Sequence, residues 1–135
     1  MDDITRLGQD GATIGFRPLA EPEDVEVVVD LPGLNVRERV SLDERGQLST
    51  FLASLAVDWR GWDGVRTLAT FERDFELRCH HDRVGHIVVE VLLGRVPPHE
   101  WHQVGWRVHA AVVMEPGALD DVVNSLRRSL PEFGN

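Results

Sequence analysis

Lysine and tyrosine are both absent from the 135 residues, and there is a single cysteine. All 14 basic residues are therefore arginine, a bias typical of GC-rich bacterial genomes. A chain without lysine cannot form a Schiff base through a side chain or use a lysine as a general base. The lone Cys79 excludes an internal disulfide and favours a reducing compartment. These absences exclude lysine-dependent enzymes and disulfide-rich secreted proteins.

Long apolar runs are also missing. No run approaches the ~18 residues that cross a membrane, and the first residues, Met1-Asp2-Asp3, lack the charge and apolar stretch of a secretory signal. Hydrophobic residues make up 42% of the chain, enough for a core and too many for a disordered protein. We therefore expect one soluble, cytoplasmic domain over residues 11–131, with flexible tails at 1–10 and 132–135.

The charge is strongly acidic, with 23 acidic against 14 basic residues and a formal net charge of −9. Nucleic-acid binding needs a basic surface that displaces counterions from phosphates, so this balance argues against it. Anionic membranes are disfavoured for the same reason. A basic protein partner is favoured, because opposite fields raise association rates.

Common catalytic signatures do not occur. The sequence has no Gly-x-Gly-x-x-Gly, phosphate loop, nucleophile elbow, Cys-x-x-Cys or His-Glu-x-x-His motif. Many enzymes lack such motifs, so an enzyme is not excluded. The sequence nevertheless favours a non-catalytic protein, and we identify no catalytic residue and no cofactor.

Alternation of apolar and polar residues predicts β-strands at 12–17, 24–31, 34–42, 75–79, 87–93 and 104–114. Apolar side chains on both faces near the end of the last strand, at residues 110–113, indicate a central strand covered on both sides. A helix is predicted between the third and fourth strands, and another after the last. We therefore expect an α+β domain in the order β-β-β-α-β-β-β-α. Its sheet is mainly antiparallel, with about six strands and two helices on one face.

The two helices have separate signals. Ser41-Leu-Asp-Glu44 has the form of a capping box, which predicts where the first helix begins. The buried face of this helix comprises Leu48, Phe51, Leu52, Leu55, Ala56 and Trp59, and the helix ends at Gly61. Pro116 opens the second helix, whose buried face comprises Leu119, Val122, Val123, Leu126 and Leu130.

An acidic segment near the second predicted strand is the first candidate binding surface. Its residues are Glu21, Glu23, Asp24, Glu26 and Asp30. A solvated edge strand, protected by charge from pairing with other chains, explains the segment. The alternative is a docking face for a basic partner.

The tryptophans and the turn after the first helix give further candidates. Trp59 and Trp106 share the inward positions of their elements, so we expect both in the core. Trp62 lies in a turn, where we expect partial exposure, and with Asp63 it is a candidate partner contact. Asp58 and Asp63 bracket this turn, and we expect them to cap it or to pair with Arg60 or Arg66.

The histidines are the strongest candidates for a metal site. If Cys79 pairs with Ile87, His80 lies opposite His86 and the two imidazoles can share a metal ion. His81 and Asp82 at the hairpin tip could add ligands. Arg78 on the same face repels a cation, however, and two unsupported ligands are too few, so we predict no metal site. His99 and His102 are assigned to ordinary loop polarity.

The segment Leu48–Glu72, with Phe-Leu-Ala-Ser-Leu-Ala-Val-Asp-Trp-Arg-Gly-Trp-Asp-Gly-Val-Arg-Thr at its centre, resembles a family of small uncharacterised proteins from GC-rich bacteria. The resemblance continues through His81-Asp82, Gly85-His86 and the C-terminal helix. Leu68 replaces the usual aromatic residue, and Arg83-Val84 is an insertion. The layout is also similar, by pattern alone, to immunity proteins against WapA-type toxins. That similarity implies an acidic inhibitor of a basic toxin.

Two functions remain open from the sequence. The first is a non-catalytic protein-binding module, most concretely an immunity-type inhibitor that binds a basic toxin through the acidic segment and Trp62. The second is a small-molecule-binding protein or enzyme with a pocket between helix and sheet, drawing on His80, His81 and His86.

Overall fold

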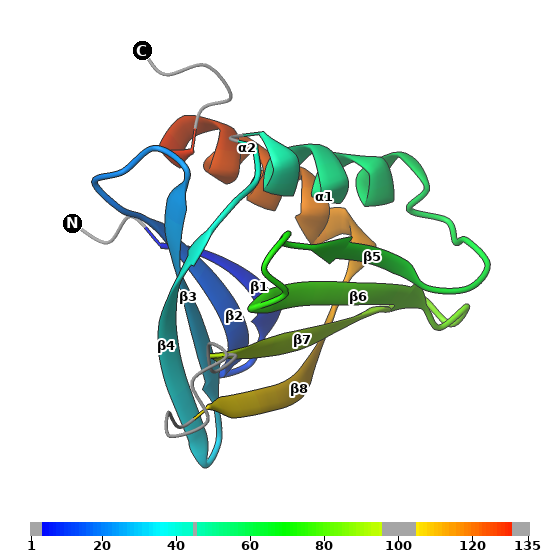
Figure 1. The fold of residues 1–135 in the computed structure, drawn as a ribbon. Coiled ribbons are helices and arrows are strands. Elements are labelled where there is room, and N and C mark those ends of the chain that lie inside the picture. Colours follow the sequence, from blue (N-terminus) through cyan, green and yellow to red (C-terminus); the bar gives the residue numbers. More distant parts are fainter. Residues whose placement is uncertain (1–3, 45, 96–104, 131–135) are drawn as a thin grey trace.

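The computed structural model describes residues 4–44, 46–95 and 105–130. These residues form eight strands, two α-helices and one 3-10 turn (Figure 1). In chain order they are β1 (Thr5–Gln9), β2 (Ala12–Pro18), β3 (Asp24–Leu31), β4 (Leu34–Ser41), α1 (Gln47–Val57), β5 (Arg66–Ala69), β6 (Phe75–His81), β7 (Ile87–Arg95), β8 (Trp106–Met114), η1 (Pro116–Ala118) and α2 (Leu119–Ser129).

The strands form two antiparallel sheets of four, ordered β1-β2-β3-β4 and β5-β6-β7-β8. The predicted α+β class and antiparallel pairing are confirmed. The expected single sheet of about six strands is wrong, because the described residues contain two further strands, β1 and β5, and divide between two sheets. In each sheet the strands follow one another in sequence order, and the connections within a sheet that the structure describes in full are short turns or loops.

A single core joins the sheets and the helices. The predicted alternation places Val25, Val27 and Val29 of β3 in it with no exposed surface. The rings of Phe16 in β2 and Phe75 in β6 meet edge to face, with centroids 5.9 Å apart, where the inner faces of the two sheets pack together. Helices α1 and α2 contact each other and lie together along one side of the sheets (Figure 1). Burying each such apolar side chain contributes about 1.5–3 kcal/mol.

Strand β1 lies within residues 1–10, which the sequence assigned to a flexible tail. Leu7 is fully buried, and the hydroxyl of Thr5 lies 2.6 Å from that of Ser125 in α2. Asp10 and Gly11 form the hairpin to β2, both with positive φ, at 56° and 80°. Asp-Gly is a strong signal for such a two-residue turn. The strand itself is too short and polar to show an alternating pattern.

The first helix begins later than predicted. Ser41 is the last residue of β4 and is paired with Asp24, so it does not cap a helix. Helix α1 starts at Gln47 after Gly46, without a side-chain cap. Strand β4 extends to the first residue of the supposed capping box, and the pairing of Ser41 with Asp24 overrides this local signal.

Strand β8 is an edge of its sheet rather than a central strand. Its outer face is open, with Val113 42% exposed. The strand lies beside β1, the edge of the other sheet. The end of β8 has apolar residues on both faces, which suggested a central position. Only its inner face packs into the core, and its outer face is exposed to solvent.

The hairpin between β6 and β7 is longer than the sequence suggested. His81 pairs with Ile87, so Cys79 pairs with Val89 and His80 with Val88. The assumed pairing of Cys79 with Ile87 is wrong, and His80 does not lie opposite His86. The five residues 82–86 form the hairpin tip instead.

Candidate functional site

The predicted acidic segment lies mostly on β3, which is a central strand between β2 and β4 and not an edge. The outward acidic residues on β3 have partners on both neighbouring strands. Arg17 lies 2.9 Å from Glu26, Arg39 is paired with Asp24, and the amide of Asn35 donates to Asp30 over 3.2 Å. Cross-strand pairing therefore explains these three acidic residues, and the edge-strand interpretation is wrong.

Glu21 and Glu23 are exposed on the loop between β2 and β3. The carbonyl of Glu23 accepts a 2.7 Å hydrogen bond from the N–H of Leu42, in the connection to α1. On the same connection, the carboxylate of Asp43 accepts a 3.1 Å bond from the N–H of Phe71, in the turn between β5 and β6. These two bonds hold three connecting segments together as one surface.

Exposed acidic side chains gather on this surface, which we call the acidic rim: Glu21, Glu23, Asp43, Glu44 and Glu72. None of the five has an ion-pair partner within residues 4–44, 46–95 and 105–130. Arg73 is an exposed basic residue on the same turn. Unlike the acidic residues of β3, the rim carboxylates leave a negative field facing solvent.

Phe71 lies among the rim residues and is 88% exposed. Its turn is held on both sides, because the N–H of Arg73 donates to the carbonyl of Thr70 over 3.0 Å and the hydroxyl of Thr70 lies 2.6 Å from the carboxylate of Asp74. Thr70 itself is buried. A fixed turn therefore presents an aromatic side chain to solvent. The only sequence signal for it is an aromatic residue in a polar turn.

The tryptophans after α1 exchange their expected positions. Trp62 is only 6% exposed, and its Nε1 donates to the carbonyl of Cys79 over 3.4 Å. Trp59 is 53% exposed. Both expectations are wrong for one reason: α1 ends at Val57, so its buried stripe stops at Leu55 and the following turn directs Trp62 into the core instead.

The aspartates of this turn have arginine partners. Asp58 lies 2.7 Å from Arg66, which confirms a predicted pair. Asp63 is paired with Arg83 of the β6–β7 hairpin. The guanidinium of Arg66 also lies 5.0 Å from the centre of the Trp62 ring. Trp106 is partly buried against the core.

Exposed Trp59 lines a cleft of about 720 Å³, which we call the Trp59 cleft. Three elements build it: the end of α1, the β6–β7 hairpin and the junction of β8 with α2. The lining residues are Ala56, Trp59, Arg60, His81, Arg83, Gly85, Glu115, Pro116, Gly117 and Asp120. The guanidinium of Arg60 lies over the indole of Trp59, 5.1 Å from the ring centre.

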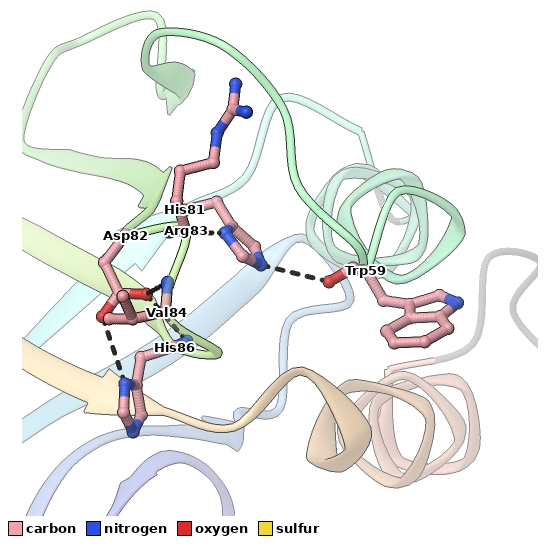
Figure 2. Close-up of polar contacts among 6 residues, drawn as sticks. All are labelled: Trp59, His81, Asp82, Arg83, Val84 and His86. Atoms are coloured by element: carbon pink, nitrogen blue, oxygen red, sulfur yellow. Dashed lines mark hydrogen bonds and ion pairs between the residues drawn. The ribbon is translucent and has the colours of Figure 1, made fainter.

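Figure 2 shows how the hairpin joins this cleft. His81 Nε2 lies 3.2 Å from the carbonyl of Trp59, and the N–H of Arg83 donates to His81 Nδ1 over 2.9 Å. The side chain of Arg83 extends away from His86 (Figure 2), and it reaches Asp63. Of the three histidines proposed for a pocket, only His81 lines the cleft.

Asp82 organises the hairpin tip. Its carboxylate accepts hydrogen bonds from the N–H groups of Val84 and His86, both over 2.9 Å, and lies 3.1 Å from His86 Nδ1. Desolvation alone would raise the pKa of the Asp82 carboxyl, but these donors outweigh it and hold the pKa below its ordinary value. Both the main-chain N–H and the ring of His86 therefore contact the Asp82 carboxylate.

The described residues contain no group of three or more side chains suited to a metal ion. His99 and His102 lie outside these residues. Cys79 is fully buried, and burial, followed by the charge of Glu90, raises the pKa of its thiol to about 12. The thiol is therefore protonated at neutral pH and is a poor nucleophile. Among the helices of the described chain, none has the length and apolar character to cross a membrane.

The comparison with curated proteins found no match, and neither did the comparison with solved structures. A match to a protein family begins within β2 and extends past α2, so it covers both helices and every strand of the two sheets except β1. It confirms the resemblance to an uncharacterised family noted from the segment Leu48–Glu72. Because the match spans residues 13–132, the chain belongs to DUF6228, a family of unknown function.

Proposed function

We propose that this protein is a non-catalytic binding module that uses the acidic rim and Phe71 to hold a basic protein. In its most concrete form it is an immunity-type inhibitor of a basic toxin, acting in the cytoplasm of a GC-rich bacterium. The observation that carries the proposal is the 88% exposure of Phe71 on a fixed turn among carboxylates without ion-pair partners in the described chain.

Phe71 supplies what the acidic residues lack. Charge complementarity raises association rates and selects partners, but it adds little affinity by itself. Aromatic residues at the centre of an interface provide the apolar anchor. Because its turn is already ordered by Thr70 and Asp74, little further entropy is lost when Phe71 is buried by a partner.

The rim modifies the set of contact residues expected from the sequence. Glu21 and Glu23 remain in it, and Asp43, Glu44 and Glu72 join them. Four of the expected residues already have polar partners within the chain: Asp24, Glu26, Asp30 and Asp63. They add to the negative field, but a new ion pair with a partner protein would require these contacts to break. Trp62 is in the core and is not part of the proposed contact surface.

A charge-matched pair of variants tests the proposal. In the rim variant, Glu21, Glu23, Glu44 and Glu72 become Gln, which leaves the Asp43 bond to Phe71 intact. In the control variant, Asp10→Asn, Glu115→Gln, Asp120→Asn and Asp121→Asn change the net charge equally on other exposed surfaces. Each protein is used to capture partners from native lysate at low and high salt.

We expect a basic protein to be retained by the wild type and the control variant, released at high salt and lost by the rim variant. A photo-crosslinking residue at position 71 should then link to that same protein, and adding the purified chain should suppress its toxic activity. Equal retention by both variants, crosslinking elsewhere or undiminished toxic activity would contradict the proposal.

The Trp59 cleft favours a second candidate function, a small-molecule-binding protein. Its volume lies in the range of ligand sites, and it combines an aromatic face with charged groups. The cleft lies between the end of α1, the hairpin and the α2 junction, which agrees with a pocket between helix and sheet.

A further inference from the structure

The charges that line the Trp59 cleft are arranged by sign. Arg60 comes from the end of α1, whereas Glu115 and Asp120 come from the junction of β8 with α2. All three are exposed and have no ion-pair partner among the described residues. Arg83 also lines the cleft, but its guanidinium is already paired with Asp63. The free positive and negative groups of the cleft therefore lie on different walls.

We propose that the Trp59 cleft binds a small zwitterion, namely an amino acid or a short peptide with free termini. The ligand's carboxylate pairs with Arg60, and its ammonium group lies between Glu115 and Asp120. Its side chain packs against the exposed indole of Trp59 and the ring of Pro116. Planar guanidinium groups match carboxylates well, and ammonium groups are three-fold donors that suit two carboxylate acceptors.

A zwitterion fits these charges better than an ion of one sign. An anion would meet two carboxylates in a chain whose net charge is −9, and a cation would leave Arg60 facing it. The indole of Trp59 is 53% exposed, with Arg60 over one face, so a ligand can cover the rest of the ring. The cleft of about 720 Å³ is large enough for a dipeptide.

The walls are held in place before any ligand binds. The bond between His81 and the Trp59 carbonyl fixes the hairpin against the end of α1. The pair of Arg83 with Asp63 fixes the same hairpin to the following turn. A preformed site loses less entropy on binding than one that must be ordered. This site is separate from the acidic rim, because the rim adjoins the start of α1 and the cleft adjoins its end, about 16 Å away at 1.5 Å per residue.

Calorimetric titration of the full chain with three related probes tests the proposal. Glycyl-leucine carries both charges, N-acetyl-glycyl-leucine only the carboxylate, and glycyl-leucinamide only the ammonium group. We expect glycyl-leucine to bind about tenfold or more tightly than either analogue, because each lost charge removes a charge-assisted hydrogen bond. If glycyl-leucinamide bound as tightly as glycyl-leucine, the ligand would be a cation rather than a zwitterion. If no probe bound, the proposed site would be wrong.

Two single variants test which residue binds the carboxylate of the ligand and which binds its ammonium group. Arg60→Gln should abolish the preference for a free carboxylate, and Asp120→Asn should reduce the preference for a free amine. Arg128→Gln and Asp121→Asn are matched controls, since both residues are exposed on α2 and neither lines the cleft. Unchanged probe selectivity in Arg60→Gln and Asp120→Asn would contradict the assignment. The rim variant should bind glycyl-leucine normally, so the two sites can fail independently.

Discussion

His81 donates a hydrogen bond from Nε2 to the main-chain carbonyl of Trp59, 3.2 Å away, and so ties the β6–β7 hairpin to the end of α1. The same ring accepts a bond at Nδ1 from the N–H of Arg83. A ring nitrogen that accepts a hydrogen bond carries no proton, so the network assigns the proton of the neutral imidazole to Nε2. Protonation of Nδ1 would break the bond to Arg83.

Replacing His81 should loosen this attachment. His81→Ala removes both hydrogen bonds and the edge contact with Trp62, whose ring centre lies 5.7 Å away. We expect the free energy of unfolding in urea to fall by about 1–3 kcal/mol. His81→Asn should recover part of the loss, because its carbonyl can accept from Arg83. As a control, His80→Ala on the outer sheet face should change stability by less than about 0.5 kcal/mol, and an equal loss would contradict the role of His81.

Asp82 should make the hairpin sensitive to acid. Its pKa is held below the ordinary value of 3.8, so its ionised form contributes stability above that pH. This contribution is lost as the pH falls through the lower value of the folded state. The stability difference between wild type and Asp82→Asn, measured by urea unfolding from neutral to acid pH, should therefore shrink in acid. The difference between wild type and Gln9→Ala, which removes no titratable group, should stay constant, and an acid-independent effect of Asp82→Asn would contradict this prediction.

Cys79 should dominate the alkaline stability of the chain. Its pKa rises from 9.0 to about 12 on folding, so the stability it contributes is complete below pH 9 and is lost as the pH rises toward 12. Lysine and tyrosine, whose side chains ordinarily titrate in this range, are absent. We expect the unfolding free energy to fall by about 1.4 kcal/mol per pH unit above pH 9. In Cys79→Ala this pH dependence of the unfolding free energy should disappear. If the slope were unchanged, a group other than Cys79 would be its cause.

Strand β1 should be essential to stability although it is short. Leu7 is fully buried, so Leu7→Ala should lower the free energy of unfolding by about 2–5 kcal/mol. Gln9→Ala, at an exposed position of the same strand, should have little effect. Thermal and urea unfolding compare the two variants. Equal stability of both would mean that the strand does not contribute to the core.

Hydrophobic alternation predicted the strands that have long inward runs. In β3 and β6 the core positions follow from the pattern alone, because each strand has three or more apolar residues at alternate positions. The four residues of β5 and the five of β1 are too few for such a signal. How the strands divide between two sheets depends on long-range packing, such as that of Phe16 against Phe75, which no local pattern records.

The candidate sites were less predictable for geometric reasons. The exchange of Trp59 and Trp62 depends on where α1 ends, and boundaries are the least certain part of a helix pattern. The acidic residues of β3 looked free because their arginine partners lie on other strands, as with Arg39 and Asp24. The acidic rim joins segments from three parts of the chain, held by the bonds of Leu42 and Phe71. Only Glu21 and Glu23 could be identified from sequence clustering.

Because of the sequence order of the strands, the interactions within each half of the molecule differ in kind from those between the two halves. Each sheet draws its strands from one contiguous stretch, residues 5–41 or residues 66–114, so ladder pairing can form early and locally in each. The halves are then joined by side chains, including Phe16 with Phe75 and Arg95 with Glu38, 3.1 Å apart. Cleavage of the chain before α1 would thus leave each ladder intact, and burial of the apolar inner faces would favour reassociation of the two fragments.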